Sequence, residues 1–582
     1  MRRVRTDVLI LGSGGAGLFA ALHVHRGAPG ARIAVAVKGL LGKCGCTRMV
    51  QGGYNAALAE GDSVSRHFMD TIEGGKWLND QDLAWALVAQ APIRLRELEN
   101  EIGCFFDRNP DGTLHQKAFA GQTFDRTVHK GDLTGIEIMN RLSEQVWARD
   151  IERLEEHRAL ALIPDAQGDG IAGVLLTDMR SGEFVFVQAR AVLLATGGGP
   201  TMYKYHTPSG DKSCDGMAMA LRLGLPLRDM EMVQFHPTGL LAGPGTRMTG
   251  TVLEEGLRGA GGLLLGGDGE RFMQRYDLRG ERATRDIVSR AIYQEIRNGN
   301  TSPNGGVYLS MGHLGPEQVR HQFRGMVKRC TDCGFDLAAG RVEVIPTAHY
   351  MMGGVEFAVD CTTEVGGLFA AGEDTGGVHG ANRLGGNGVA NATVFGGLAG
   401  DSIARYLTTP DAQWRAPDEA RLRQENEAAR MPLTLPPGDL ESIREALFET
   451  MWADAGILRH ADGLYRALDH LNALDRQLAH TGVAGGEPAF NLAWHDWLNL
   501  RNLLLVSRAI ATSALARENS RGAHFREDFP GPGSWEHSQF NRIRLHEGGG
   551  LRVTSVPVVF SRVQPGHELI DEAAAADAPA AK

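Results

Sequence analysis

The sequence predicts an α/β fold with a buried parallel sheet, an inserted α+β domain, a C-terminal helical domain and a small C-terminal segment that contains strand. Three short apolar runs carry the first part of this prediction, because each is typical of a buried parallel strand followed by glycine. They are Asp7–Leu11, Arg190–Pro200 and Gly366–Asp374. Since these runs lie far apart in the chain, we expect one sheet assembled from distant segments.

The first strand opens a β-α-β unit, in which a glycine-rich loop and a helix of small residues lead to a second strand at Arg32–Lys38. Glycine lets a backbone come close to a pyrophosphate, and the N-terminus of the following helix supplies N–H donors. The unit therefore predicts a Rossmann-like dinucleotide-binding domain, and a merely tight turn is the structural alternative. The loop consists of Gly12, Ser13, Gly14, Gly15, Ala16 and Gly17.

The end of the second strand bears on which dinucleotide is bound. A standard NAD site has an acidic residue near this point that binds the ribose hydroxyl. Here the strand ends in Val37 and Lys38, without an acid. This counts against a standard NAD site and leaves FAD open, with Glu373 as a candidate ribose partner.

The middle of the chain, residues 239–349, is rich in arginine and glycine and is predicted to be an insertion. The nucleotide-binding domain is then discontinuous and comprises residues 1–238 and 350–410.

After residue 410 the pattern becomes helical, and we predict a helical domain over residues 411–530. The segment Asp439–Met451 places Leu440, Ile443, Leu447 and Met451 on one face and has Asp439 as its N-cap. A second long helix is predicted at Asn499–Asn519. Residues 531–571 form the predicted C-terminal segment, with a strand at Leu551–Val563, and residues 572–582 are predicted to be a disordered tail.

Composition narrows the class of protein. The 582 residues carry a formal net charge of −10 and include no long basic run, so we expect no nucleic-acid partner. Seven irregularly spaced cysteines do not form a disulfide framework and fit a reducing compartment, which predicts a cytoplasmic protein. No stretch of eighteen apolar residues occurs, so we expect no direct membrane insertion.

Five further blocks of sequence carry a resemblance to one enzyme family. Their order and length resemble the succinate dehydrogenase/fumarate reductase flavoprotein family, which also includes L-aspartate oxidase. The resemblance covers the chain from Asp7 to about Gln564. The segments ENSRGAHFREDFP, VPVVFSRVQP and RLGGN favour the dehydrogenase/reductase branch. The blocks are MEMVQFHPTG with His236, EEGLRGAGG with Glu255 and Arg258, TRDIVSRAI with Arg290, PTAHYMMGGV with His349, and GGVHGANRLGGNGVANATVFGG with Arg383.

The resemblance implies FAD as cofactor and hydride transfer between flavin N5 and a C4 dicarboxylate or close analogue. It implies that Arg383, His236 and His349 bind the substrate carboxylates, and that Arg290 gives or takes the proton. It also implies that residues 239–349 form a mobile capping domain, whose closure over the substrate excludes water and brings Arg290 to the flavin. Glu255 and Arg258 match the relay that supports this arginine. The family's flavin contacts match the glycine loop and, in addition, Lys38, Cys46, Thr47, Gln51, Gly52, Gly53, Asp215, Glu373, Asn387, Gly388 and Val389.

Two departures from the family pattern qualify this expectation. Glu254 stands where the dehydrogenase branch usually has a threonine that binds the substrate, so either Glu254 points away, or Thr249 or Thr251 substitutes, or the substrate carries a different polar group. Cys46 stands where succinate dehydrogenases carry the histidine that bonds FAD covalently. We expect noncovalent FAD, with a thioether at Cys46 as the alternative.

The cysteines could also supply a zinc site, because Cys44, Cys46, Cys330 and Cys333 offer four thiolates. No spacing argument brings the two pairs together, so we expect no metal. The family resemblance further implies that a separate iron–sulfur subunit is the electron partner, and that membrane association occurs only through partner subunits. The alternatives are a stand-alone L-aspartate oxidase-like enzyme and a non-catalytic flavin-binding subunit.

Overall fold

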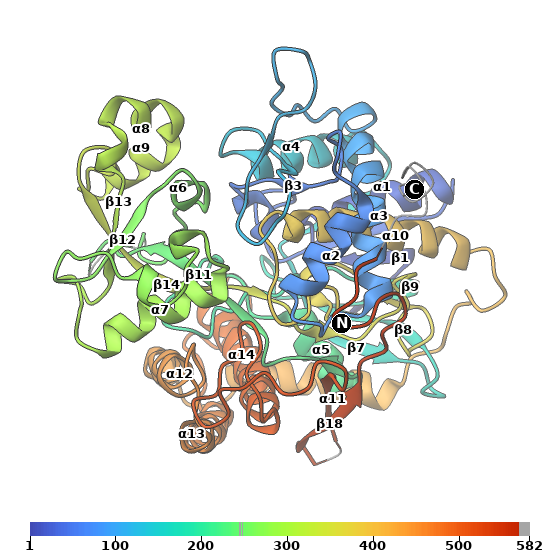
Figure 1. Ribbon diagram of the computed structural model, residues 1–582. Helices are drawn as coiled ribbons and strands as arrows, with labels where there is room; N and C mark the ends of the chain where they lie inside the picture. The colour runs from blue at the N-terminus through green and yellow to red at the C-terminus, as the bar shows by residue number, and fades with distance from the viewer. Residues whose placement is uncertain (244–245, 247, 547, 570–582) are drawn as a thin grey trace.

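The computed structural model describes residues 1–243, 246, 248–546 and 548–569 (Figure 1). Its centre is a seven-stranded sheet in which the strands follow the order β6-β2-β1-β9-β8-β7 and β16 pairs with β9. The strands are β1 (Arg2–Leu11), β2 (Ile33–Val37), β6 (Glu152–Glu155), β7 (His157–Pro164), β8 (Ile171–Asp178), β9 (Phe184–Leu194) and β16 (Leu368–Ala370).

The prediction of one sheet built from distant segments is confirmed. Strand β1 runs parallel to both β2 and β9, and β16 runs parallel to β9 on the other side. Strand β1 begins five residues before the predicted Asp7, because Arg2–Thr6 also pairs with β9. Of these residues only Thr6 is buried and three are arginines, so this half lacks the continuous apolar run on which the prediction rested.

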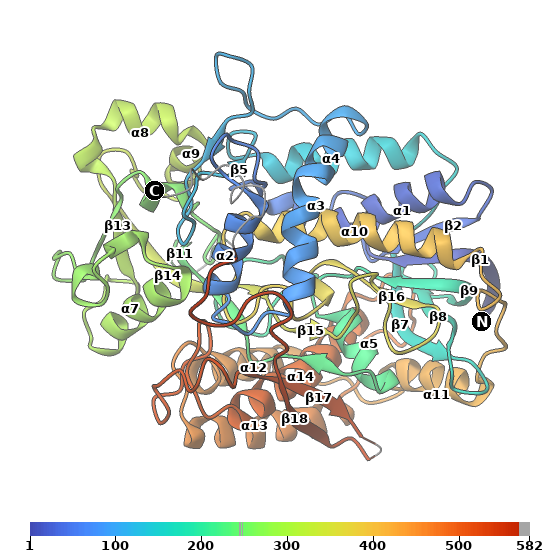
Figure 2. The same ribbon diagram turned by 45° about the vertical axis from the view of Figure 1, so that its right-hand side comes forward.

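The two faces of the sheet have separate cores. Val8 and Ile10 point into one core, whereas Leu9 and Leu11 point into the other, as the period of two in a strand requires. Figure 2 shows α1, α3, α4 and α10 together on one face. These helices are α1 (Gly15–Gly27), α3 (Gln81–Asn100), α4 (Thr134–Trp147) and α10 (Asn387–Tyr406), with α2 (Val64–Gly74) beside them.

The opposite core brings the helical C-terminal region against the sheet. The predicted N-cap is present, since the Asp439 side chain accepts a hydrogen bond from Ser442 N, and Ile443, Leu447 and Met451 are buried. The predicted helix Asn499–Asn519 is part of α14, which starts seven residues earlier and ends three residues earlier. The helices are α5 (Asp215–Leu223), α11 (Glu419–Arg430), α12 (Leu440–Asp454), α13 (Ala461–Ala479) and α14 (Leu492–Ala516).

The inserted region has an antiparallel sheet of order β11-β14-β13-β12 and a hydrophobic core of its own (Figure 1, left). Both predicted limits, residues 239 and 349, fall inside strands, because β11 and β14 run from the main body into this region. Its elements are β11 (Val233–Leu240), α6 (Gly256–Gly259), β12 (Leu263–Leu265), α7 (Arg285–Arg297), β13 (Val307–Ser310), α8 (Pro316–Gln322), α9 (Arg324–Asp332) and β14 (Arg341–Met351). We call residues 239–349 the cap.

Two smaller sheets complete the fold. One has the order β15-β10-β17-β18 and contains β10 (Leu227–Arg228), β15 (Gly354–Val355), β17 (Gln539–Leu545) and β18 (Leu551–Pro557). The other contains β3 (Tyr54–Asn55), β4 (Gln116–Lys117) and β5 (Thr127–Val128). The predicted strand Leu551–Val563 thus ends at Pro557, and the predicted tail at 572–582 lies outside the described residues. Within the described ranges, no helix combines the length and apolar character needed to cross a membrane.

Candidate active site

One cavity of about 500 Å³ lies where β1, β2 and β9 end and reaches from there to the cap. The carboxyl ends of parallel strands are where ligands bind in open α/β sheets. Most of the predicted site residues line this cavity. The sequence reasoning did not single out several other lining residues, among them Thr207, Lys212, Arg285, Arg329 and Tyr350.

The glycine loop forms one wall of the cavity. Gly12 has φ +109°, and a Cβ there would lie 2.1 Å from the Ala195 carbonyl oxygen, so only glycine fits. A Cβ on Gly17 would lie 2.0 Å from Gly12 O, and Gly17 packs the helix against the strand without lining the cavity. Gly14 is the N-cap of α1 and provides no side-chain cap. Gly14, Gly15 and Ala16 at the N-terminus of α1 line the cavity, although Gly15 N donates to Thr47 Oγ1 at 3.1 Å, and this end of the helix is suited to an anion.

Lys38 and Asp215 meet at the end of β2. Lys38 Nζ lies 2.7 Å from Asp215 Oδ2, and Arg158 Nη2 lies 3.1 Å from Asp215 Oδ1. Burial raises the pKa of Asp215, but Lys38 and Arg158 outweigh it and hold the pKa well below its usual range. The ionised carboxylate sits beside the cavity, where it can accept a ligand hydroxyl.

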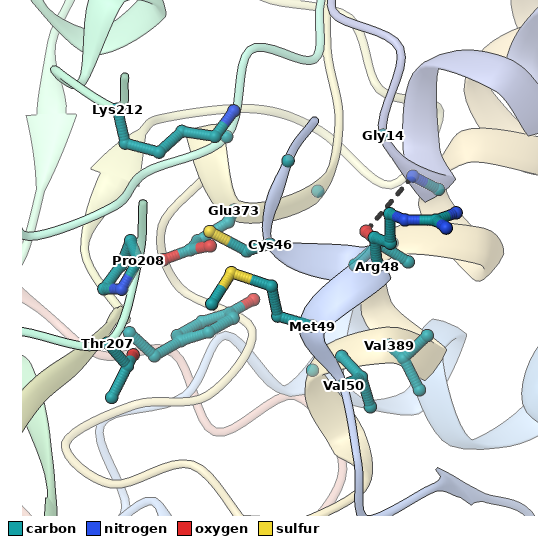
Figure 3. Close-up of a pocket in the computed structure, with 18 of the residues that line it drawn as sticks. Gly14, Cys46, Arg48, Met49, Val50, Thr207, Pro208, Lys212, Glu373 and Val389 are labelled. Carbon is teal, nitrogen blue, oxygen red and sulfur yellow. Dashed lines mark hydrogen bonds between the residues drawn. The ribbon is translucent and has the colours of Figure 1, made fainter. Parts of the chain in front are cut away.

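Cys46 begins a short 3₁₀ turn, Cys46–Met49, that wraps around the cavity. Figure 3 shows Cys46 and Glu373 pointing toward one another. Burial and the nearby Glu373 raise the pKa of the Cys46 thiol to about 12. Glu373 Oε1 accepts hydrogen bonds from Met351 N at 3.0 Å and Gly199 N at 3.3 Å, and burial raises its pKa to about 7.

The stretch that begins at Cys46 continues to Gly53, and at Gly52 and Gly53 its backbone lies very close to neighbouring residues. A Cβ on Gly52 would lie 2.6 Å from the Phe119 ring, and one on Gly53 would lie 2.3 Å from Val128 O. Thr47, Gln51, Gly52 and Gly53 all line the cavity. The backbone of this stretch therefore runs directly along the cavity wall.

The start of α10 forms the opposite wall. Gly388 and Val389 line the cavity, whereas Asn387 does not. The Asn387 amide lies behind the wall, where its Oδ1 accepts from Asn55 Nδ2 at 2.7 Å and its Nδ2 donates to Thr71 Oγ1 at 3.2 Å. Asn387 thus holds the end of the helix rather than facing the cavity.

At the cap end, the cavity is lined by a cluster of cationic and imidazole side chains. Arg383 is buried, its guanidinium carbon lies 4.5 Å from the Tyr350 ring centroid, and its Nε has no hydrogen-bond partner among the described residues. The rings of His236 and His349 are 5.3 Å apart. Burial and Arg285 lower the pKa of both histidines well below the usual value, so both are neutral at pH 7.

Arg285 is the cationic residue of this cluster that the sequence reasoning missed. Its Nε and Nη2 donate to Glu255 Oε2 at 2.8 and 2.7 Å, and its Nη1 donates to Gln234 Oε1 at 3.1 Å. Burial raises the pKa of Glu255, but Arg285 and Arg258 outweigh it and lower the pKa. The result is a buried, ionised arginine–carboxylate pair at the cavity wall.

Arg290, to which the family resemblance assigns the proton, lies outside this cluster in the structure. Arg290 does not line the cavity, and its Nη1 donates to Gly522 O at 2.6 Å. Both arginines stand in the block TRDIVSRAI, but five residues on an α-helix amount to about 140° of rotation. Arg285, in the first turn of α7, faces the cavity, so Arg290 must face elsewhere. Thr284 as N-cap marks that first turn, and this signal was available in the sequence.

Arg258 also lies outside the cavity but supports it. Its Nη1 donates to Glu281 O at 2.7 Å, and its Nη2 lies 3.8 Å from Glu255 Oε1. It is buried, and burial lowers its pKa despite Glu255. Arg258 therefore contacts Glu255 from behind, on the side away from the cavity.

Glu254 lines the cavity, but its carboxyl is directed to the boundary of the cap. Its Oε2 is 3.9 Å from Lys117 Nζ, and the other charged groups near it are Asp132 and Arg329. Burial raises the pKa of Glu254, which Lys117 only partly offsets. Of the two proposed substitutes, Thr251 lines the cavity, whereas the Thr249 hydroxyl donates to Gly243 O at 3.3 Å.

The cysteines are divided between two places. Cys44 and Cys46 line the cavity, whereas Cys330 is buried in the core of the cap. All seven cysteines are free. In the described part of the chain, no group of three or more histidine, cysteine or acidic side chains is arranged to hold a metal ion.

Comparison with protein families gives two matches along the chain. A model described as an FAD binding domain matches residues 7–389. A second model, described as the fumarate reductase flavoprotein C-terminal region, matches residues 444–569. The two matches together cover the cavity, the cap and most of the helical region.

Curated relatives and solved structures agree with these matches. The chain is 43% identical over 533 residues to a component of the CoM/CoB fumarate reductase of Methanothermobacter marburgensis, covering 90% of this chain and 94% of the relative. It is 35% identical over 548 residues to the Escherichia coli fumarate reductase flavoprotein subunit, covering 91% and 89%.

Among solved structures, a variant of E. coli quinol fumarate reductase FrdA superposes with a TM-score of 0.91 at 33% identity, covering 98% of this chain and 99% of that chain. Mycobacterium smegmatis Sdh1 superposes with a TM-score of 0.84 at 36% identity, covering 96% and 94%. The likeness therefore spans the whole architecture.

Proposed function

Because the chain belongs to the FAD-dependent oxidoreductase family of fumarate reductase and succinate dehydrogenase flavoproteins, we propose that it interconverts a C4 dicarboxylate and its unsaturated counterpart. One observation carries the proposal. The cavity that offers a glycine cradle at one end has Arg285, Arg383, His236 and His349 at the other. Guanidinium groups bind carboxylates in a bidentate manner, so this end fits a small acid.

The residues present fit FAD. The N-terminus of α1 and the glycine loop suit a pyrophosphate, and the Lys38–Asp215 pair lies where the β2 end meets the cavity. Glu373, Gly388 and Val389 line the same continuous space. When bound, FAD supplies the atom that accepts or gives hydride, and the protein orients and polarises. The N-terminus of α10 would place its partial positive charge at the cofactor.

We propose that FAD is held noncovalently. The supporting observation is the raised pKa of the Cys46 thiol, about 12, because a thioether requires a thiolate. The thiol is thus protonated at pH 7. The nearby Glu373 makes ionisation of Cys46 still less favourable.

For the substrate, we propose that Arg383 grips one carboxylate, since its Nε is buried without a partner among the described residues. His236 and His349, both neutral, donate ring N–H groups to the carboxylates. Thr207 Oγ1 lies 2.8 Å from His349 Nδ1 and so orients this ring toward the cavity. Glu254 takes no part in holding the carboxylates, because its own carboxyl faces Lys117 and Arg329.

For the proton, we propose that Arg285 takes the role that the sequence assigned to Arg290. An arginine has a pKa above 12 and acts as an acid–base group only when a relay supports it. Glu255 accepts two hydrogen bonds from Arg285 and contacts Arg258 on its other side. The order Arg285, Glu255, Arg258 leads from the cavity into the buried interior of the cap and can return the proton to Arg285.

The experiment is a steady-state assay of the FAD-loaded protein with fumarate and a reduced dye, with succinate and an oxidised dye, and with L-aspartate and oxygen. We expect turnover with the first or the second pair. Arg285→Lys is expected to lower kcat by roughly 100-fold or more while FAD remains bound. Turnover only with L-aspartate, or with none of the three, would contradict the substrate proposal.

We further propose that electrons pass to an iron–sulfur protein on a separate chain, through which any membrane association is indirect. Support comes from the family and from the sequence, which has no ferredoxin-type cysteine cluster. Size-exclusion chromatography after co-expression with neighbouring genes tests this. A protein that reduces fumarate at full rate with a physiological donor while remaining alone would contradict it.

A further inference from the structure

We propose that Arg290 is a positioning residue that braces Arg285 against the segment carrying Arg383, by way of the backbone at Gly522 and Ala523. The inference rests on the proposed function, because it concerns the spacing of the two arginines assigned to the substrate. Arg285 belongs to the cap and Arg383 to the main body, so a physical link must set their separation.

The first contact in the link is made by α7. Arg290 Nη1 donates to Gly522 O at 2.6 Å, and its guanidinium carbon lies 5.2 Å from the Phe525 ring centroid. Its Nη2 also lies 3.4 Å from Asp286, one turn earlier on the same helix. Arg290 therefore connects the first turn of α7, which carries Arg285, to the chain that follows α14.

The second contact leads to Arg383. Ala523 N donates to Ala381 O at 2.8 Å, and Ala381 stands two residues before Arg383. Gly522 has φ +53°, and a Cβ there would lie only 2.3 Å from Ala381 O. The two backbones are thus in direct contact, and only glycine permits this approach.

The chain that receives Arg290 is itself immobilised. Arg526 is buried and its Nη1 donates to Ala514 O at 3.0 Å, at the end of α14. Ser520 Oγ accepts from Arg526 N and donates to Phe529 O, both at 2.8 Å. Because this loop is held in place, its contact with Arg290 can fix the position of α7.

The other side of α7 rests on the main body near His236. Ser289 Oγ donates to Phe235 O at 3.1 Å, and Arg285 Nη1 donates to Gln234. The helix is therefore held between β11 on one side and the Gly522 loop on the other. Without Arg290, the link from Arg285 through Gln234 remains, since Gln234 Nε2 donates to Arg383 O at 2.7 Å. The half of α7 nearer to Arg285 nevertheless loses its contact with the Gly522 loop, and Arg285 gains freedom relative to Arg383.

The expected kinetic effect follows from this geometry. Ground-state binding by Arg383 and the histidines does not pass through Arg290, so KM should change little. Proton transfer needs Arg285 at a defined position, and misplacement by about 1 Å can cost on the order of 100-fold in rate. Loss of the brace should therefore lower kcat with KM nearly unchanged.

The test compares Arg290→Ala with Arg290→Lys and with Arg297→Ala as a matched control. Arg297 makes the same kind of bridge, from α7 to Glu527 at 2.6 Å, but lies three turns from Arg285. We expect Arg290→Ala to lower kcat by about tenfold or more, with KM within threefold. Lysine should restore part of the rate, and Arg297→Ala should match the wild type.

A double variant tests whether Arg290 affects the rate through Arg285. If Arg290 acts through Arg285, adding Arg290→Ala to Arg285→Lys should lower kcat no further. Equal kcat values for Arg290→Ala and Arg297→Ala, or additive losses in the double variant, would overturn the brace. Full activity of Arg285→Lys would instead overturn the proposed function, so the two failures are distinct.

FAD content and thermal unfolding are measured on each variant. If Arg290→Ala does not fold, two other variants test the same contacts. Gly522→Ala displaces the carbonyl that accepts from Arg290 while the arginine stays intact. Phe525→Leu removes only the aromatic ring beside the Arg290 guanidinium. A kcat loss in Gly522→Ala at unchanged FAD content supports the brace. Unchanged kcat in both substitutes would overturn it.

Discussion

At the scale of single residues, the site depends on a few side chains whose chemistry is set by burial. His236 is 1% exposed, and together with His349 it is kept neutral beside Arg285. Glu255 stays ionised in the same surroundings, because two arginines contact it. A neutral donor, an ionised acceptor and a cationic arginine therefore lie side by side in one buried site.

Thr207 allows a prediction at this scale. Its hydroxyl lies 2.8 Å from His349 Nδ1 and fixes which ring nitrogen faces the cavity. Thr207→Val keeps the shape and removes this bond, which is worth about 1 kcal/mol. We expect KM for the dicarboxylate to rise about fivefold with kcat nearly unchanged, as measured by steady-state kinetics. Thr249→Val, whose hydroxyl bonds Gly243 O away from the cavity, should leave KM unaltered.

At the scale of elements, α1, α3 and α10 are joined by a buried ionic cluster. His23 on α1 lies 2.9 Å from Glu97 on α3 and 2.7 Å from Asp401 on α10. Arg94 on α3 also contacts both carboxylates, at 3.0 and 2.9 Å. These helices carry the glycine loop and the Gly388 wall, so the cluster fixes the two walls of the cofactor cavity relative to one another.

The charge of His23 makes this cluster sensitive to pH. Burial lowers the pKa of His23, but Asp401 and Glu97 outweigh it and raise the pKa above the usual value. Its contribution to stability is thus complete below an unfolded-state pKa of about 6.5 and is lost as the pH rises through the folded pKa. The carboxylates act oppositely. Their folded pKa values are lowered to about 2, so their contribution is lost as the pH falls below about 4.

We therefore expect His23→Gln to unfold more readily than the wild type at pH 6, by about 3 kcal/mol for a broken buried pair. The difference should shrink as the pH rises toward 9, because the wild type loses the same charge. Denaturant unfolding at several pH values measures it. His470→Gln, at an exposed position on α13, is the control. A difference that stays constant with pH would contradict a charged His23.

At the scale of the whole molecule, the cavity is lined by segments spread from Leu11 to Ala392, which are distant from one another in the sequence. The glycine loop, the Cys46 wrap, the start of α10 and the cap all contribute lining residues. If FAD is held noncovalently, as proposed, it contributes to the stability of the whole, since a ligand that binds only the folded state stabilises it by mass action. At a free ligand concentration of 100 times Kd this amounts to about 2.7 kcal/mol.

Acid precipitation is expected to leave the yellow FAD in the supernatant. FAD-free protein prepared under mild conditions should unfold at a lower temperature, and its Tm should rise with the logarithm of added FAD. Differential scanning fluorimetry measures the second effect. A yellow pellet after precipitation would show a covalent bond, and Cys46→Ser would then release the colour.

The sequence by itself determined the β-α-β unit, the shared parallel sheet, the Asp439 cap and the family, because these depend on local patterns and on motifs of fixed spacing. It also indicated His236, His349, Arg383, Glu255 and most cofactor residues, all of which line the cavity except Gly17 and Asn387. Only the tertiary structure decided between Arg285 and Arg290 and the direction of Glu254. Both arginines fit the same motif, and which faces the cavity depends on the rotation of α7 between β11 and the Gly522 loop. Glu254 Oε2 lies 3.9 Å from Lys117 Nζ, a residue distant in the sequence, and no local pattern encodes such a proximity.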